Sequence, residues 1–95
     1  MNHPVQFEKI GAKGAFFMED DGSRLAEMTL SFAGETLVII DHTDVDDRLR
    51  GTGAGRSLVG AAVAWARENG KKFIPLCPFA KSVFDKNPEW ADVLK

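Results

Sequence analysis

Apolar and polar residues alternate strictly between residues 26 and 32. The apolar positions of this stretch are Ala26, Met28, Leu30 and Phe32. A period of two predicts a strand with one buried face. A less regular pattern at residues 5–9 predicts a further strand near the start of the chain.

Turn residues separate this strand from two other apolar runs. Asp21 and Gly22 stand between it and residues 15–19, and Gly34 stands between it and residues 36–43. Short turns of this kind join antiparallel neighbours. These strands are therefore predicted to form an antiparallel meander.

From Arg56 onward the apolar residues recur every three or four positions, which is the period of a helix. Two neighbouring rows, which begin at Leu58 and Val59, give this helix a broad apolar face. Gly70 is predicted to end it.

Residues 72–76 then predict a short buried strand, which Cys77 follows. Pro78 suits the first position of a last helix. That helix runs to about Lys86, and Asn87 is predicted to stop it.

The order of these elements predicts an α+β fold with a mainly antiparallel, mixed sheet. A helix connects strands 36–43 and 72–76, so these two strands are expected to be parallel neighbours. The glycine-rich loop and Cys77 follow their ends. Both are therefore expected at one edge of the sheet, where chemistry is predicted.

Length and composition limit the class of protein. A chain of 95 residues with 44% hydrophobic and 27% charged side chains predicts one domain, residues 1–95. The net charge of −2 disfavours a nucleic-acid partner, and no apolar run approaches the ~20 residues of a membrane span. A single cysteine and the lack of an apolar leader favour a cytoplasmic location.

The stretch RLRGTGAGRSL at residues 48–58 precedes the long helix. Its glycines are Gly51, Gly53 and Gly55. A helix N-terminus offers free amides and a partial positive charge, and glycines let an anion approach. Arg50 and Arg56 can add charge-assisted hydrogen bonds. The loop thus predicts a phosphate site, with a plain strand-to-helix turn as the alternative.

Two familiar phosphate motifs do not fit this loop. GTGAGRS is one residue short of a Walker A loop and has Arg56 where a lysine is needed. A dinucleotide fingerprint requires glycine at position 56 or 58, and Leu58 stands at the second of these.

The segment Arg50 to Gly55, RGTGAG, instead matches the [QR]-x-x-G-x-[GA] loop of the GNAT acetyltransferase superfamily. The segments IDHTDVDDRLRGTGAGRSLVGAAVAWARENG and FIPLCPFAKSVFDKNPEW resemble its compact single-domain YjdJ-type subgroup over nearly all of residues 14–94. This resemblance implies the small GNAT fold, acetyl-CoA as co-substrate, no metal, and N-acetyltransferase activity.

The resemblance also implies how acetyl-CoA is bound. The pyrophosphate would lie on the amides of residues 51–56, and pantetheine would follow strand 36–43 where it meets strand 72–76. Backbone groups of Thr43 and Val45 would bind pantetheine and the thioester carbonyl. The implied cofactor-binding residues are Thr43, Val45, Arg50, Gly51, Thr52, Gly53, Ala54, Gly55 and Arg56.

The catalytic groups are less well defined, because many superfamily members protonate the leaving sulfur with a tyrosine and this chain has none. Histidine is a common general base at neutral pH, so His42 is a candidate base. Alternatively, it is hydrogen-bonded beneath the loop and supports residues 44–50. Alternation places Asp41 on the opposite strand face, either solvated or paired with an arginine.

Cys77 is the second candidate, because a helix N-terminus favours thiolate and hence nucleophilic or acid chemistry. Alternatively, it is a small apolar filler beside the cofactor sulfur. Ser82 or Asn87 could order a water, although each also has a plain structural interpretation. Trp65 and Trp90 are predicted to be core residues rather than adenine contacts.

The sequence therefore predicts an acetyl-CoA-binding protein that transfers acetyl to an amine acceptor, either a small amine or a protein lysine. A non-catalytic CoA-binding or acyl-CoA-sensing module is the alternative, motivated by the missing tyrosine. An RNA-binding domain is disfavoured by the acidic balance. The acceptor is not specified.

Overall fold

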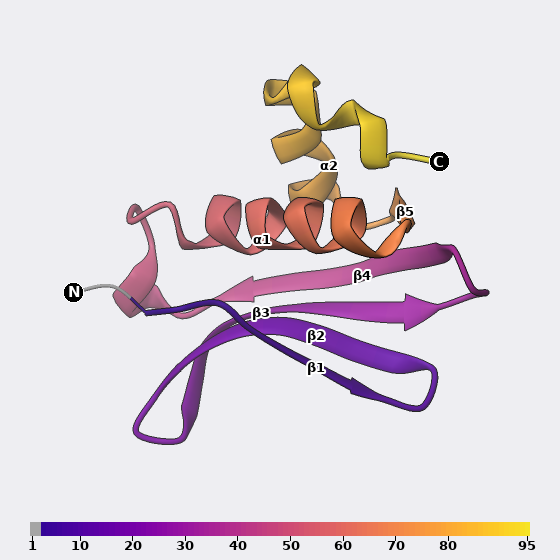
Figure 1. Ribbon diagram of the computed structural model, residues 1–95. Helices are drawn as coiled ribbons and strands as arrows, with labels where there is room; N and C mark the ends of the chain where they lie inside the picture. Colours follow the sequence, from indigo (N-terminus) through magenta and orange to yellow (C-terminus); the bar gives the residue numbers. More distant parts are fainter. Residues whose placement is uncertain (1–2) are drawn as a thin grey trace.

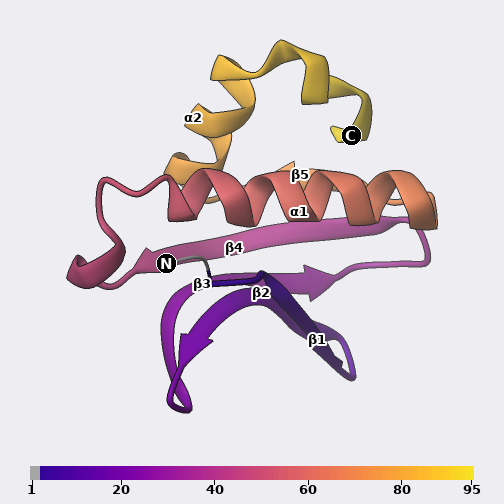
Figure 2. The ribbon, with the colours of Figure 1, turned by 60° about the vertical axis from the view of Figure 1, so that its left-hand side comes forward.

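The structure, a computed structural model, describes residues 3–95. One sheet contains β1 (Gln6–Ile10), β2 (Lys13–Asp20), β3 (Ser23–Phe32), β4 (Leu37–Val45) and β5 (Lys72–Pro75), in that order. The helices are α1 (Ala54–Asn69) and α2 (Pro78–Lys86), with the short 3₁₀ segments η1 (Asp47–Leu49) and η2 (Pro88–Val93). Both α1 and α2 lie on the same side of the sheet (Figures 1 and 2).

The predicted α+β architecture is confirmed. Strands β1 to β4 pair antiparallel, and β4 pairs with β5 in parallel through the α1 crossover. The turn between β2 and β3 places Asp21 and Gly22 at φ values of 50° and 79°, as a tight hairpin requires. Helix α1 begins at Ala54, earlier than the predicted Arg56. The first residues of the helix precede the apolar rows by which the sequence predicts it.

The core lies between the sheet and α1. Met28, Leu30 and Ile40 are fully buried there against residues of α1 such as Leu58. Trp65 of α1 contacts the rings of several phenylalanines, which are Phe7, Phe16, Phe32 and Phe73. Trp90 also packs against the core, so both tryptophans have the predicted core role.

A β-bulge interrupts the pairing of β3 with β4. Thr29 lies opposite His42, but the next residue of β3 lies opposite Ile40, so Asp41 is the extra residue. The bulge resets the alternation, and Thr43 now faces the helix side with its buried partner Met28. Asp41 and His42 instead line the same hollow on the other face. The prediction that these two residues lie on opposite faces is wrong, because simple alternation does not anticipate the bulge.

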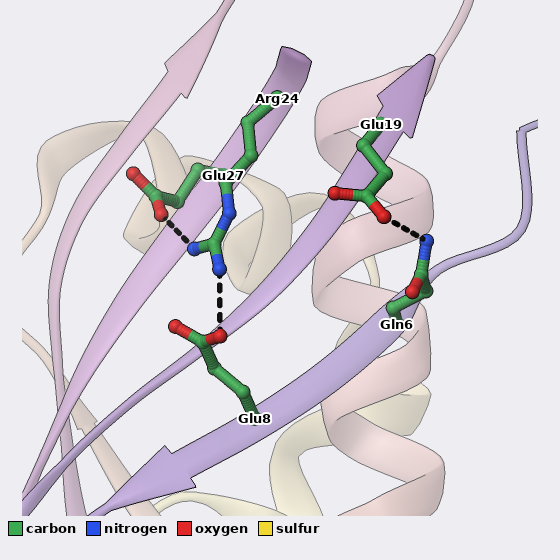
Figure 3. A network of polar contacts seen from close by, with 5 residues as sticks. All are labelled: Gln6, Glu8, Glu19, Arg24 and Glu27. Carbon is green, nitrogen blue, oxygen red and sulfur yellow. Dashed lines mark hydrogen bonds and ion pairs between the residues drawn. The ribbon is translucent and has the colours of Figure 1, made fainter. Parts of the chain in front are cut away.

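We call the helix-free side of the sheet the open face (Figure 2). On it, Arg24 forms ion pairs with Glu8, at 2.6 Å, and with Glu27 (Figure 3). Its guanidinium carbon also lies 3.9 Å from the ring centroid of Phe17. Within residues 3–95, no helix has the length and apolar character needed to cross a membrane.

Candidate functional site

Strands β4 and β5 separate at one end of the sheet. Their pairing ends with Ile40 opposite Pro75. The Ile40 carbonyl accepts hydrogen bonds from the amides of Leu76 and Cys77, at 3.0 and 3.3 Å. Strand β4 then continues to Val45 beyond the last residue that β5 pairs with. The resulting gap has the end of β4 on one side and the start of α2 on the other.

A cleft of about 650 Å³ lies beside this gap. Its walls are the end of β4, the glycine-rich loop, the start of α1 and one side of α2. Its lining includes these predicted cofactor-binding residues: Thr43, Val45, Arg50, Gly51, Gly53, Ala54, Gly55 and Arg56. Thr52 is not in the lining, and its hydroxyl donates to the Leu49 carbonyl instead. A volume of this size suits a small-molecule or cofactor site.

The loop backbone explains two of the glycines. Gly51 and Gly53 have φ values of 79° and 82°, which L side chains rarely adopt. Cβ atoms at these positions would meet nothing within 4 Å, so conformation rather than crowding selects glycine. Gly53 caps α1, and the first hydrogen bond of the helix joins the Ser57 amide to the Gly53 carbonyl. The amides of residues 54–56 precede that bond and are suited to an anion.

Gly55 has a different role. A Cβ at this position would lie 2.4 Å from the ring of Phe79, so only glycine lets α2 approach α1 this closely. Phe79 remains 42% exposed and its ring forms part of the cleft wall. The third glycine of the loop is therefore explained by helix packing.

Arg50 and Arg56 already have protein partners. Arg50 Nε lies 2.8 Å from Asp47 Oδ1 on the exposed surface. Arg56 Nη2 donates to Asn87 Oδ1 at 2.9 Å, and its guanidinium carbon lies 4.9 Å from the ring centroid of Trp90. Asn87 is itself buried. Arg56 is thus held at the wall of the cleft by a hydrogen bond and a cation–π contact.

Cys77 connects the two sides of the gap. It is the N-cap residue of α2 and is buried, and its Sγ lies 3.4 Å from Thr43 Oγ1. Burial raises the pKa of the thiol, but the Thr43 hydroxyl and the amides of Ala80 and Phe79 together lower that pKa below its ordinary value. The expected position of Cys77 beside the end of β4 is confirmed.

The profile of the GCN5-related N-acetyl-transferase family matches residues 15–93. The chain therefore belongs to this family. A GCN5-like protein from Staphylococcus aureus is 37% identical, with a TM-score of 0.73 over 95% of this chain and 87% of its own. No curated protein matches the sequence.

Two more distant structures share the N-acetyltransferase fold. A ribosomal-protein-alanine N-acetyltransferase from Brucella melitensis biovar Abortus 2308 is 18% identical, with a TM-score of 0.67 over 82% of this chain and 62% of its own. The IAA acetyltransferase from Bacillus cereus ATCC 14579 is 19% identical, with a TM-score of 0.61 over 79% of this chain and 53% of its own. The YjdJ-type subgroup stays a prediction.

His42 lies outside the cleft of this family member. The bulge turns it to the open face, where it is exposed and lines a second hollow with Asp41 and Thr29. The alternative of a histidine held beneath the loop is therefore wrong. Asp41 is half-buried and accepts a hydrogen bond from Ser31, at 2.7 Å, so its predicted solvated or arginine-paired state is also corrected.

One side of α2 contributes cleft residues that the sequence analysis did not assign to cofactor binding. These are Phe79, Ser82, Val83 and Lys86, followed by Asn87. They recur every three or four positions, which places them along one side of the helix. That spacing could have identified them once the loop was known to face α2. The Ser82 hydroxyl donates to the Phe79 carbonyl, in keeping with its plain structural interpretation.

Proposed function

We propose that this family member binds acetyl-CoA in the cleft and transfers the acetyl group to an amine. The observation that carries the proposal is the cleft itself. It joins unbonded amides at the start of α1 to a gap between β4 and β5 where Thr43 meets Cys77.

The pyrophosphate is assigned to the amides of residues 54–56, because the Thr52 amide already donates to the Leu49 carbonyl at 3.2 Å. The left-handed Gly51 and Gly53 leave open space beside this backbone, and a helix N-terminus stabilises negative charge. Arg50 and Arg56 add positive charge at the cleft wall. Pantetheine is assigned to the β4 edge from Thr43 to Val45, beyond the last residue that pairs with β5.

The proposed reaction is direct attack by a neutral amine on the thioester carbonyl carbon. A C–N bond forms, the C–S bond breaks, and the CoA thiolate takes up a proton. His42 is proposed as the base that deprotonates the incoming ammonium from the open face. Cys77 is proposed either to donate the proton to sulfur or to carry the acetyl group as a thioester before the amine takes it.

The decisive test is thiol release from acetyl-CoA with a panel of lysine peptides, polyamines and small amines. Release that depends on the amine supports the transferase. Tight binding of CoA without any release supports the alternative of a sensing module instead.

Two variants then separate the catalytic roles. His42→Gln is expected to keep CoA affinity and to lower the transfer rate about 100 to 10,000-fold, the usual contribution of a general base. Unchanged rates would remove His42 from the mechanism. Cys77→Ser should abolish any single added acetyl group seen by intact mass. If it transfers acetyl at the wild-type rate, direct attack by the amine remains.

A further inference from the structure

The hollow on the open face has the chemistry of a binding site of its own. Its volume is about 670 Å³. Its lining residues come from three strands and from the residue after β5, and they include Lys13, Thr29, Asp41, His42 and Leu76. A cation, an anion and apolar surface are thus brought together in one depression.

The hollow lies directly across β4 from the cleft. Asp41 and His42 line the hollow, whereas the following residue, Thr43, lines the cleft. On the other side of the gap, Leu76 lines the hollow and the next residue, Cys77, contacts Thr43. A group held in the hollow beside His42 is therefore next to the gap that the cleft reaches from the opposite face.

Two opposite charges are held in the hollow by one hydroxyl. Lys13 Nζ donates to Ser31 Oγ at 2.8 Å, and Ser31 Oγ donates to Asp41 Oδ2 at 2.7 Å. These residues follow the strand order β2, β3, β4, so the carboxylate is nearest the gap and the ammonium is farthest from it.

Arg24 is another cation on the open face, but its charge is already paired. Arg24 is bound between the carboxylates of Glu8 and Glu27 (Figure 3). Its guanidinium also stacks on Phe17. Lys13 instead donates to the neutral hydroxyl of Ser31, so it can bind an incoming carboxylate without breaking an ion pair. Leu76 is 64% exposed and offers apolar contact at the gap.

From this arrangement we infer that the acceptor is a free amino acid, bound in the hollow with its ammonium at Asp41 and its carboxylate at Lys13. This inference rests on the proposed function. It adds a substrate class: an amine whose neighbouring carbon bears a carboxylate, as opposed to a lysine side chain or a polyamine.

The step balances with the groups present. The bound ammonium gives one proton to His42, and the neutral amine attacks the thioester carbonyl carbon. The C–N bond forms as the C–S bond breaks, and a second proton from the nitrogen passes to the CoA thiolate. The products are the N-acetyl amino acid, the CoA thiol and one proton that leaves from His42.

The test compares leucine with leucinamide, which keeps the amine but lacks the carboxylate. Wild-type protein should show kcat/KM at least about tenfold higher for leucine, as expected for one charge-assisted contact. Lys13→Met should reduce that ratio about tenfold by raising KM for leucine. Lys9→Met is the control, because Lys9 donates to the Gly11 carbonyl outside the hollow and should leave the ratio unchanged.

Binding provides a readout that does not need turnover. With CoA present, leucine should shift the backbone amide resonances of residues 29 and 41–42, and Asp41→Asn should abolish these shifts. Leucine binding that depends on Lys13 and Asp41 supports the amino-acid site in the hollow. If no thiol is released in that case, the proposed transferase activity fails while the site remains. Three results would overturn the assignment: equal use of leucine and leucinamide, acetylation of lysine peptides alone, or no leucine binding. None of them decides the proposed transferase activity, which thiol release tests separately.

Discussion

Cys77 Sγ lies 3.4 Å from Thr43 Oγ1, and this contact joins the first turn of α2 to the end of β4. It exists because the bulge at Asp41 turns Thr43 toward the helix side of the sheet. A thiol at a helix N-cap and a hydroxyl on the facing strand thus meet in the gap where the thioester is proposed to lie.

The first prediction concerns the titration of this thiol. Because the pKa of Cys77 is lowered in the folded chain, iodoacetamide should alkylate it with a pH midpoint below that of the urea-unfolded chain. Thr43→Val should raise the midpoint, whereas Thr29→Val, on the opposite face, should not. A folded midpoint equal to the unfolded one would contradict the prediction.

The same shift sets a pH dependence of stability. The folded pKa of Cys77 is the lower one, so thiolate stabilises the fold above the pKa of the unfolded chain. This contribution is lost as the pH falls through the folded pKa. The difference in unfolding free energy between wild type and Cys77→Ser should therefore increase with pH across that window, as measured by urea unfolding.

The second prediction concerns charge at the start of α1. Gly53→Asp should abolish CoA binding, because it sets a carboxylate against the phosphates. It should also lower stability by about 1–2 kcal/mol, because φ at this position is 82°. Gly53→Asn has the same shape and the same backbone strain without the charge. Calorimetry should find residual CoA affinity in Gly53→Asn only, and equal affinities would refute the pyrophosphate assignment.

The third prediction concerns the contact between Gly55 and Phe79. Gly55→Ala should destabilise the fold by about 1–3 kcal/mol, because its Cβ would lie 2.4 Å from the ring. Adding Phe79→Leu should recover part of this loss, with a coupling energy above about 0.5 kcal/mol.

A matched control for this cycle is Gly60→Ala. Its Cβ would lie 3.4 Å from Trp90, which is ordinary contact, and alanine is the better helix former. Gly60→Ala should therefore be neutral or stabilising in thermal unfolding. Additive effects of Gly55→Ala and Phe79→Leu would show that the ring does not enforce the glycine.

The fourth prediction concerns Arg56. Arg56→Ala removes a charged donor from the cleft wall and should lower CoA affinity about 10 to 150-fold, equivalent to about 1.5–3 kcal/mol. Arg56→Lys keeps the charge but loses the planar contact with Trp90, so its affinity should be intermediate. Arg67→Ala serves as the control, because Arg67 pairs with Asp92 outside the cleft. Unchanged affinity in Arg56→Ala would place the phosphates elsewhere.

The fold was predictable because local signals and burial agree. The period of two at residues 26–32, the Asp21-Gly22 turn and the apolar rows of α1 each correspond to an observed element. The parallel pairing followed from the helix crossover, and it brought Cys77 to the end of β4.

The site was less predictable because its details depend on contacts between distant residues. A bulge at Asp41 reverses which residues of β4 face the cleft, and nothing in the apolar run of residues 36–43 marks it. The sequence predicts Gly55 as part of an anion loop, but it does not reveal that a Cβ at this position would meet the ring of Phe79 on another helix. Such contacts arise only once the tertiary packing of α2 is known.

The short parallel pairing of β4 with β5 has a consequence for the order in which the chain assembles. The meander of β1 to β4 forms from hairpins between neighbouring segments. Strand β5 can pair with β4 only once the intervening helix α1 has returned the chain to the other end of the sheet. We therefore expect β5 and α2 to detach as a unit before the meander unfolds. Because that unit carries one wall of the cleft, a bound cofactor would slow this detachment. Local unfolding and ligand release would then be the same opening event.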